Sequence, residues 1–148
     1  MKHFAIAALV AAATLIMAGS ASAQQQQAVQ ANIPFSFTVN NHQLPAGTYT
    51  MWRDSSMSHV MYLEDRDNGI RVIALSSAVA SVDEKSSELV FHKYGEQYFL
   101  SEIRSAGSST DTQLPVSGAE KRARAAAEEA GLRVNTNRTV ALNSYPSR

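Results

Sequence analysis

The sequence predicts an all-β domain followed by a C-terminal helix, with about six to seven strands forming a small antiparallel β-sandwich or a partly closed barrel. Apolar and polar residues alternate between residues 31 and 104, where Val, Ile, Phe, Tyr and Thr are frequent. Gly, Pro and Asn divide this region into short segments. The later segments are partly apolar on both faces, which favours a small sandwich or a partly closed barrel whose second face is partly covered.

The chain begins with the pattern of an export signal. A short cationic end precedes an apolar run over residues 4–18, and small side chains lead up to Ala23. This run is shorter than the roughly twenty residues that cross a bilayer as a helix. We therefore expect residues 1–23 to be cleaved between Ala23 and Gln24, leaving a periplasmic or secreted protein with no membrane span.

Charge and cysteine content exclude several classes of function. The 148 residues carry 13 Lys and Arg against 13 Asp and Glu, so the chain lacks the basic excess of a nucleic-acid-binding domain. No cysteine is present, which excludes a disulfide framework, a thiolate metal site and a cysteine nucleophile. Core packing must therefore hold an exported domain of this size together.

The mature chain is expected to start with a flexible leader over residues 24–30, because its glutamine run has no apolar side chain to bury. The β domain is predicted to occupy residues 31–104. Its first strand is predicted over residues 33–40, with Phe37 and Val39 on the same face.

A turn at residues 44–47 leads to the second predicted strand, residues 48–53. Its proline presets φ for the turn, and its glycine tolerates a positive φ or a close approach. Tyr49 and Met51 share one face of the strand, and Trp52 lies on the other.

The third and fourth strands form a predicted hairpin around residues 67–69. A three-residue loop with Gly69 in the left-handed region pairs Asp65 with Arg71. A two-residue loop would instead place Arg66 opposite Arg71, which is a repulsive pair. The sequence therefore favours the three-residue loop.

A second hairpin is predicted between residues 89–94 and 97–104. Gly95 comes first in its two-residue turn, as a type II′ turn requires. This register places Phe91 opposite Leu100.

The C-terminal part is divided by composition. Residues 105–116 are rich in Ser, Gly and Thr and are predicted to be a linker. Ser117 and Glu120 have the spacing of a capping box, which predicts a charged helix over residues 117–131. Alanine forms its only apolar stripe, so a solvated, weakly held helix is favoured over a partner-docking or oligomer-forming one. Residues 132–148 are predicted to be a disordered tail.

Four motifs mark the strand-rich region: IPFSFTV at residues 33–39, LPAGTY at 44–49, LVFHKYG at 89–95 and QYFLSEI at 97–103. With these motifs, the chain resembles a family of small exported bacterial β-rich proteins of unknown function. The resemblance implies a signal peptide, a β domain and a short charged helical end. It supplies no activity, ligand or catalytic residue, and Arg104 stands where such proteins carry an aromatic residue.

No pattern of catalytic or metal chemistry is present. His42, His59 and His92 lack the spacing of metal ligands. The acidic stretch at residues 64–69 departs from a calcium loop, because its glycine comes one residue early and Ser76 stands where the twelfth-position glutamate belongs. There is no nucleophile elbow and no phosphate loop. We assign no catalytic residue, no metal site and no cofactor.

Aromatic residues are the remaining candidates for ligand contact. We predict Trp52, Tyr94 and Tyr98 as binding residues, since aromatic rings supply contact area at a small entropic cost. The alternative is that these rings pack the sheets. Trp52 is expected to be the most exposed, because Thr48 and Thr50 share its face.

These observations favour an exported, non-catalytic binding or structural module with an unknown partner in the envelope or the extracellular space. One alternative is an enzyme acting on an envelope polymer, which requires the fold to bring together carboxylates such as Glu64, Asp65 and Glu102. The other is an oligomeric adhesin or matrix component that uses exposed strand edges.

Overall fold

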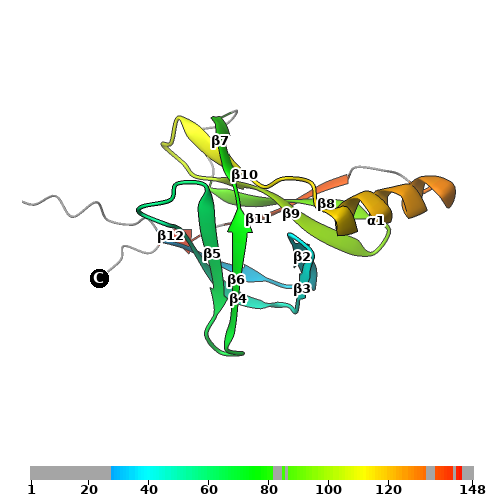
Figure 1. The fold of residues 1–148 in the computed structure, drawn as a ribbon, viewed down its shortest axis with the longest axis horizontal. Coiled ribbons are helices and arrows are strands. Elements are labelled where there is room, and N and C mark those ends of the chain that lie inside the picture. The colour runs from blue at the N-terminus through cyan, green and yellow to red at the C-terminus, as the bar shows by residue number, and fades with distance from the viewer. Residues whose placement is uncertain (1–27, 82–84, 86, 133–135, 142, 145–148) are drawn as a thin grey trace, which may run out of the picture.

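A computed structural model describes residues 28–81, 85, 87–132, 136–141 and 143–144. These residues form two β-sheets and a helix (Figure 1). The sheets do not close into a barrel, so the predicted fold class is confirmed in its sandwich form. The predicted signal sequence and its cleavage site lie outside the described residues.

The first sheet has the strand order β12-β1-β4-β5-β6, and its neighbouring strands are antiparallel. Its strands are β1 (Val29–Ile33), β4 (Gly47–Arg53), β5 (Val60–Asp65), β6 (Ile70–Leu75) and β12 (Asn143–Ser144). The register matches the predicted alternation in β4, where Tyr49 and Met51 are buried and Trp52 lies on the opposite face.

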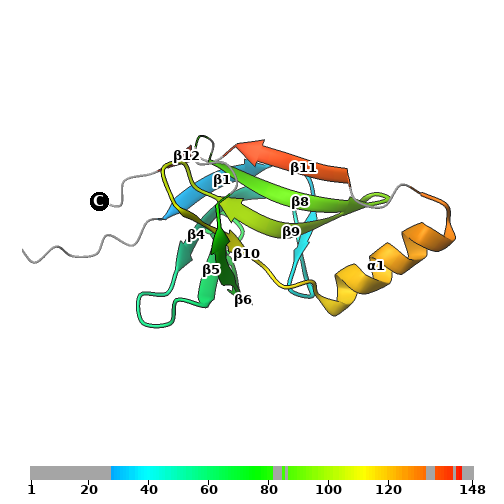
Figure 2. The ribbon, with the colours of Figure 1, turned by 90° about the horizontal axis from the view of Figure 1, so that it is seen from above.

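The second sheet has the order β11-β8-β9-β10-β7, and a short hairpin joins it at β9. Its strands are β2 (Phe37–Val39), β3 (His42–Leu44), β7 (Ser77–Ala80), β8 (Glu88–Tyr94), β9 (Gln97–Arg104), β10 (Thr110–Gln113) and β11 (Thr136–Ala141). β2 runs parallel to β9 and pairs with it at Thr38 and Phe99. The helix α1 (Gly118–Glu129) lies beside the β8–β9 hairpin (Figure 2).

The core lies between the two sheets and is rich in aromatic side chains. The Phe37 ring meets Tyr49 of the first sheet and Phe91 of the second edge-on, with ring centroids 5.1 and 5.5 Å apart. The Tyr49 hydroxyl donates a hydrogen bond to the Pro45 carbonyl at 2.8 Å. Because these rings bridge the sheets, their burial supplies much of the apolar area that the fold removes from water.

The first predicted strand is wrong as a single element. β1 ends at Ile33, and the chain leaves the first sheet at Pro34 before entering the second sheet as β2. Proline has no amide hydrogen for a ladder, which explains the break at this position. The predicted burial of Phe37 and Val39 on one face is confirmed.

The register of the β5–β6 hairpin also differs from both considered alternatives. Asp65 pairs with Ile70, which leaves four residues in the loop. The reason is the Asp65 carboxylate, which is fully buried and accepts hydrogen bonds from the backbone of Asp67 and Asn68 and from the Asn68 amide, at 2.7–3.2 Å. The prediction of a left-handed Gly69 is confirmed, with a φ of 66°.

The β8–β9 hairpin follows its predicted register from Phe91 to the turn, and a bulge between Val90 and Phe91 shifts the register beyond it. Phe91 lies opposite Leu100, and Tyr94 opposite Gln97 closes the turn. Gly95 has a positive φ of 59°.

Three segments predicted to be without regular structure contain strands. β1 begins inside the expected leader, β10 lies within residues 105–116, and β11 and β12 lie within residues 132–148. The number of strands therefore exceeds the six to seven that were predicted. These short segments lack clear apolar alternation, and backbone pairing with a neighbouring strand holds them in place.

The predicted helix is confirmed at both ends. The Ser117 hydroxyl accepts a hydrogen bond from the Glu120 backbone amide at 3.1 Å. Gly131, at a φ of 65°, ends the helix, and the Leu132 amide donates to the Ala127 carbonyl at 2.9 Å. Within the part of the chain that the structure describes, no helix has the length and hydropathy to cross a membrane.

Candidate functional site

Trp52 lies on the outer face of the first sheet and is partly exposed. Its ring stacks on Tyr62 of the neighbouring strand, with centroids 5.4 Å apart and planes 20° from parallel. The Arg71 guanidinium lies 5.5 Å from the Trp52 ring centroid. The Trp52 ring therefore already has two partners within its own sheet.

Tyr94 lies beneath α1 and is only 6% exposed. Its hydroxyl donates a hydrogen bond to Glu120 Oε1 at 3.2 Å, and its ring centroid is 5.8 Å from that of Phe99. Burial, reinforced by the Glu120 charge, raises the pKa of Tyr94 above its ordinary value. Tyr94 therefore holds the helix against the sheet, and the packing alternative describes it better than direct ligand contact.

Tyr98 is 8% exposed and belongs to the core. Its ring stacks on Phe35 at 4.2 Å, and its hydroxyl accepts a hydrogen bond from Arg138 Nη1 at 3.2 Å. Tyr98 also lines a surface pocket. The three predicted binding residues thus do not form one site, since Trp52 lies on the other sheet.

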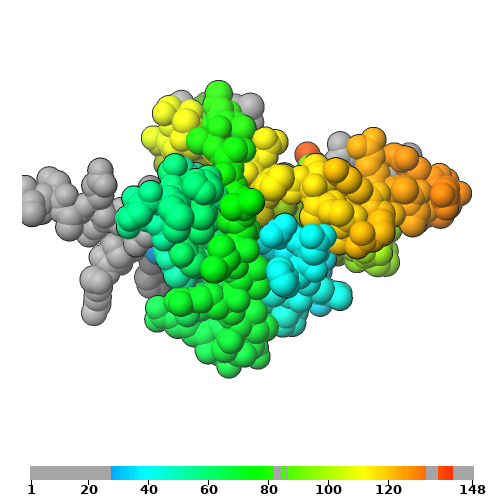
Figure 3. All heavy atoms as spheres, in the orientation of Figure 1, coloured from blue at the N-terminus to red at the C-terminus, as the bar shows by residue number. Residues whose placement is uncertain are grey.

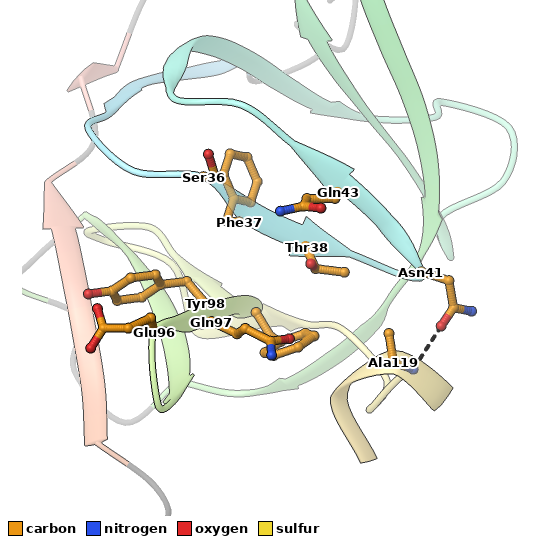
Figure 4. Close-up of a pocket in the computed structure, with 10 residues that line it drawn as sticks. Ser36, Phe37, Thr38, Asn41, Gln43, Glu96, Gln97, Tyr98 and Ala119 are labelled. Carbon is orange, nitrogen blue, oxygen red and sulfur yellow. Dashed lines mark hydrogen bonds between the residues drawn. The ribbon is translucent and has the colours of Figure 1, made fainter. Parts of the chain in front are cut away.

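This pocket has a volume of about 360 Å³ and lies between β2, β3, the β8–β9 turn and the start of α1 (Figure 4). We call it the β2–β9 pocket. Its lining residues are Ser36, Phe37, Thr38, Asn41, Gln43, Glu96, Gln97, Tyr98, Phe99 and Ala119. The β2–β3 hairpin lies on one side of it, and β9 with the β8–β9 turn lies on the other (Figure 4).

The β2–β3 turn joins the pocket to the helix. Asn40 and Asn41 both have positive φ values, 55° and 144°, which asparagine tolerates better than most residues. The Asn41 side-chain oxygen accepts a hydrogen bond from the Ala119 backbone amide at 2.9 Å (Figure 4). The hairpin and the first turn of α1 are therefore neighbours on the surface (Figure 3).

A second set of contacts fixes the helix itself. Glu120 is buried, and its Oε1 lies 2.7 Å from Nδ1 of His92 in β8. Ala123 and Ala127 pack with Tyr94 and the pocket residue Phe99. The pocket wall is thus anchored by a buried carboxylate and two alanines, while most other residues of α1 are exposed, as predicted for a solvated helix.

The chemistry of the pocket is polar and nearly uncharged. Its lining contains no Lys, Arg or His, and its single carboxylate belongs to Glu96, whose side chain is 95% exposed. Glu96 lies 3.9 Å from the Lys93 ammonium outside the pocket. Hydroxyl and amide groups, which donate and accept hydrogen bonds, make up the remaining polar lining.

The carboxylates required by the enzyme alternative lie apart. Glu64 faces Arg71 at 3.3 Å on the first sheet, and Asp65 is turned into its own loop. Glu102 belongs to the second sheet and lies 3.2 Å from Arg104. None of the three lines the β2–β9 pocket, and the described residues contain no group of three or more His, Asp or Glu suited to hold a metal ion.

Most pocket residues were not predicted as site residues. The sequence placed Ser36 and Thr38 on the polar face of the first strand, which was the available signal. Their approach to Gln97 depends on the parallel pairing of β2 with β9, which no local sequence motif predicts. Gln43 and Asn41 likewise enter the pocket through the short β3 strand and its turn.

Comparison with protein-family models, curated proteins and solved structures finds no match to this chain. Membership in the family of small exported β-rich proteins therefore stays a prediction from the sequence motifs.

Proposed function

We propose that the protein is an exported, non-catalytic binding module of the cell envelope or the extracellular space, and that the β2–β9 pocket is its ligand site. The apolar run and the small residues before Ala23 support export. The pocket supports binding, because it is concave and carries polar groups of the kind that orient a bound ligand.

The observation that carries this proposal is the fixation of the pocket by contacts from three separate parts of the chain. Asn41 ties the hairpin to α1, and Glu120 ties α1 to His92 of β8. A pocket whose walls are already held in place loses less conformational entropy on binding a ligand. This arrangement favours a binding site over an accidental surface depression.

Its lining also supports a non-catalytic role. General acid–base catalysis needs a titratable group within reach of the reacting atoms, and glycoside hydrolysis uses a pair of carboxylates. The pocket lining offers one carboxylate, on the largely exposed Glu96 side chain. Neutral amides and hydroxyls instead suit recognition by hydrogen bonding.

Co-sedimentation with the insoluble envelope fraction of the producing cells tests the proposal. We expect the purified protein to sediment with this material, and Thr38→Val and Gln97→Leu to reduce the bound fraction. Matched controls are Thr110→Val and Gln113→Leu, exposed positions on β10 outside the pocket. Equal binding by pocket and control variants would place the ligand elsewhere.

The same assay examines the predicted role of Trp52. Trp52→Ala removes the ring on the outer face of the first sheet without touching the β2–β9 pocket. If the pocket is the ligand site, this variant binds as the unmodified protein does. A loss confined to Trp52→Ala would move the site to the first sheet.

A further inference from the structure

We infer that the β2–β9 pocket takes a neutral saccharide, an inference that rests on the proposed function of this pocket. The first argument is the supply of free hydrogen-bonding groups. The side chains of Ser36, Thr38, Gln43 and Gln97 line the pocket, and the structure gives them no hydrogen bond to another described residue. Their groups are available to a ligand.

A saccharide matches these groups in kind. Each sugar hydroxyl both donates and accepts a hydrogen bond, as the serine and threonine hydroxyls do, and each glutamine amide offers both a donor and an acceptor. Displacing water from such groups costs affinity unless the ligand replaces the lost hydrogen bonds. A ligand with several hydroxyls replaces them, whereas an apolar ligand does not.

The charge of the pocket argues against an anionic ligand. Phosphate and carboxylate ligands are usually held by Arg, Lys or several backbone amides at a helix N-terminus. The lining contains no basic residue, and the Ala119 amide at the start of α1 is already bonded to Asn41. At the rim, the Glu96 carboxylate lies 3.9 Å from the Lys93 ammonium, so this pair adds no net charge. These features favour a ligand without negative charge.

The central strand of the pocket, β2, offers no free edge to an extended peptide. A peptide strand binds a sheet by pairing its backbone with an unpaired strand edge. The pocket contains the point where β2 pairs with β9, through Thr38 and Phe99, and β2 pairs with β3 on its other side. Side chains from these strands, such as Gln43 and Thr38, supply the polar contacts (Figure 4). At about 360 Å³ the site is at the small end of ligand pockets, which suits a short stretch of a glycan.

Chemical treatment of the envelope fraction tests the ligand class. Periodate cleaves the carbon–carbon bond between neighbouring hydroxyl-bearing carbons of a saccharide, whereas a protease removes peptide ligands. We expect periodate treatment of the envelope material, followed by quenching and washing, to lower the bound fraction at least tenfold. Protease treatment should change it less than twofold. Raising the salt concentration from 0.05 to 0.5 M should also change binding less than twofold. Salt screens interactions between charges, and a neutral ligand makes none.

Other outcomes have distinct meanings. Binding that is lost after protease but kept after periodate would overturn the saccharide inference in favour of a peptide ligand. Binding that resists both treatments, or that falls steeply with salt, would also overturn it while leaving a binding function in place. No binding to untreated envelope material would contradict the proposed function itself. Thr38→Val should reduce the periodate-sensitive fraction, and Thr110→Val should leave it unchanged.

Discussion

The Nδ1 atom of His92 lies 2.7 Å from Oε1 of Glu120, and this contact joins β8 to the first turn of α1. The same carboxylate oxygen accepts a hydrogen bond from the Tyr94 hydroxyl at 3.2 Å. In a capping box, the glutamate side chain would accept a hydrogen bond from the backbone amide of the N-cap residue. Here Glu120 bonds to the sheet instead, so the residue that marks the helix start also fixes the helix in the fold.

Replacing Glu120 with alanine should loosen α1. The substitution leaves His92 and Tyr94 without their shared acceptor, which costs about 1–3 kcal/mol of unfolding free energy. Urea unfolding measures this loss, and hydrogen exchange should show earlier exchange of the helix amides. Glu128→Ala is the matched control, because it removes only an exposed ion pair with Arg124, and such pairs contribute little to stability. Equal losses in the two variants would contradict the anchoring role of Glu120.

Alkaline pH should destabilise the protein through Tyr49. Burial, reinforced by the nearby Asp65 charge, raises the pKa of Tyr49 to about 12. Because the ordinary tyrosine pKa is about 10, the stabilisation is complete below pH 10 and is lost as pH rises through about 12. The expected loss is about 3 kcal/mol for a shift of this size.

Urea unfolding between pH 9 and 12 tests this prediction. Tyr49→Phe should be less stable at neutral pH, because it lacks the hydrogen bond to the Pro45 carbonyl. Its unfolding free energy should depend less on pH in the alkaline range. Part of the alkaline pH dependence should remain in this variant, because the pKa of Tyr94 is also raised. An unchanged slope in Tyr49→Phe would show that Tyr49 is not the group responsible.

Gly47 should not tolerate a side chain. A Cβ atom at this position would lie 2.6 Å from Asp65 Oδ2 and 3.4 Å from Tyr49 Cε2. Since that carboxylate is buried and holds the β5–β6 loop, Gly47→Ala should cost roughly 1–3 kcal/mol of stability. Gly118→Ala is the control, because its Cβ meets no atom closer than 3.5 Å and alanine favours the helix. A neutral Gly47→Ala would show that Asp65 is free to move.

Asp111 should be a source of instability. It is buried in β10, and neither carboxylate oxygen has a hydrogen-bond partner among the described residues. Asp111→Val would place valine opposite Val79 and should raise the unfolding free energy by about 1–3 kcal/mol. Thr110→Val, at an exposed position of the same strand, should change it by less than about 0.5 kcal/mol. A destabilised Asp111→Val protein would indicate that the carboxylate has a partner in solution.

The predictable parts of the fold are those that local chemistry determines. The positive φ values predicted for Gly69 and Gly95 are confirmed, because glycine adopts this conformation without steric cost. The helix cap predicted at Ser117 is confirmed, because its hydroxyl accepts a hydrogen bond from a backbone amide that has no partner within the helix. The β5–β6 register was predicted wrongly because the buried Asp65 carboxylate, a tertiary feature, sets the loop length.

The candidate site was predictable to a smaller extent. Tyr98 lines the β2–β9 pocket, but its neighbours are common polar residues that carry no motif. They converge because the chain breaks at Pro34 and β2 then pairs in parallel with β9. Aromatic content identified Trp52 and Tyr94 as candidates, although burial under α1 gives Tyr94 a packing role.

A map of amide chemical shifts tests the central claim most directly. The ¹⁵N-labelled protein is titrated with saccharide released from the envelope fraction. We predict that the largest shifts fall at residues 36–43, at residues 96–99 and at Ala119, around the β2–β9 pocket. Shifts centred on Trp52 and Tyr62, on the outer face of the first sheet, would contradict the account.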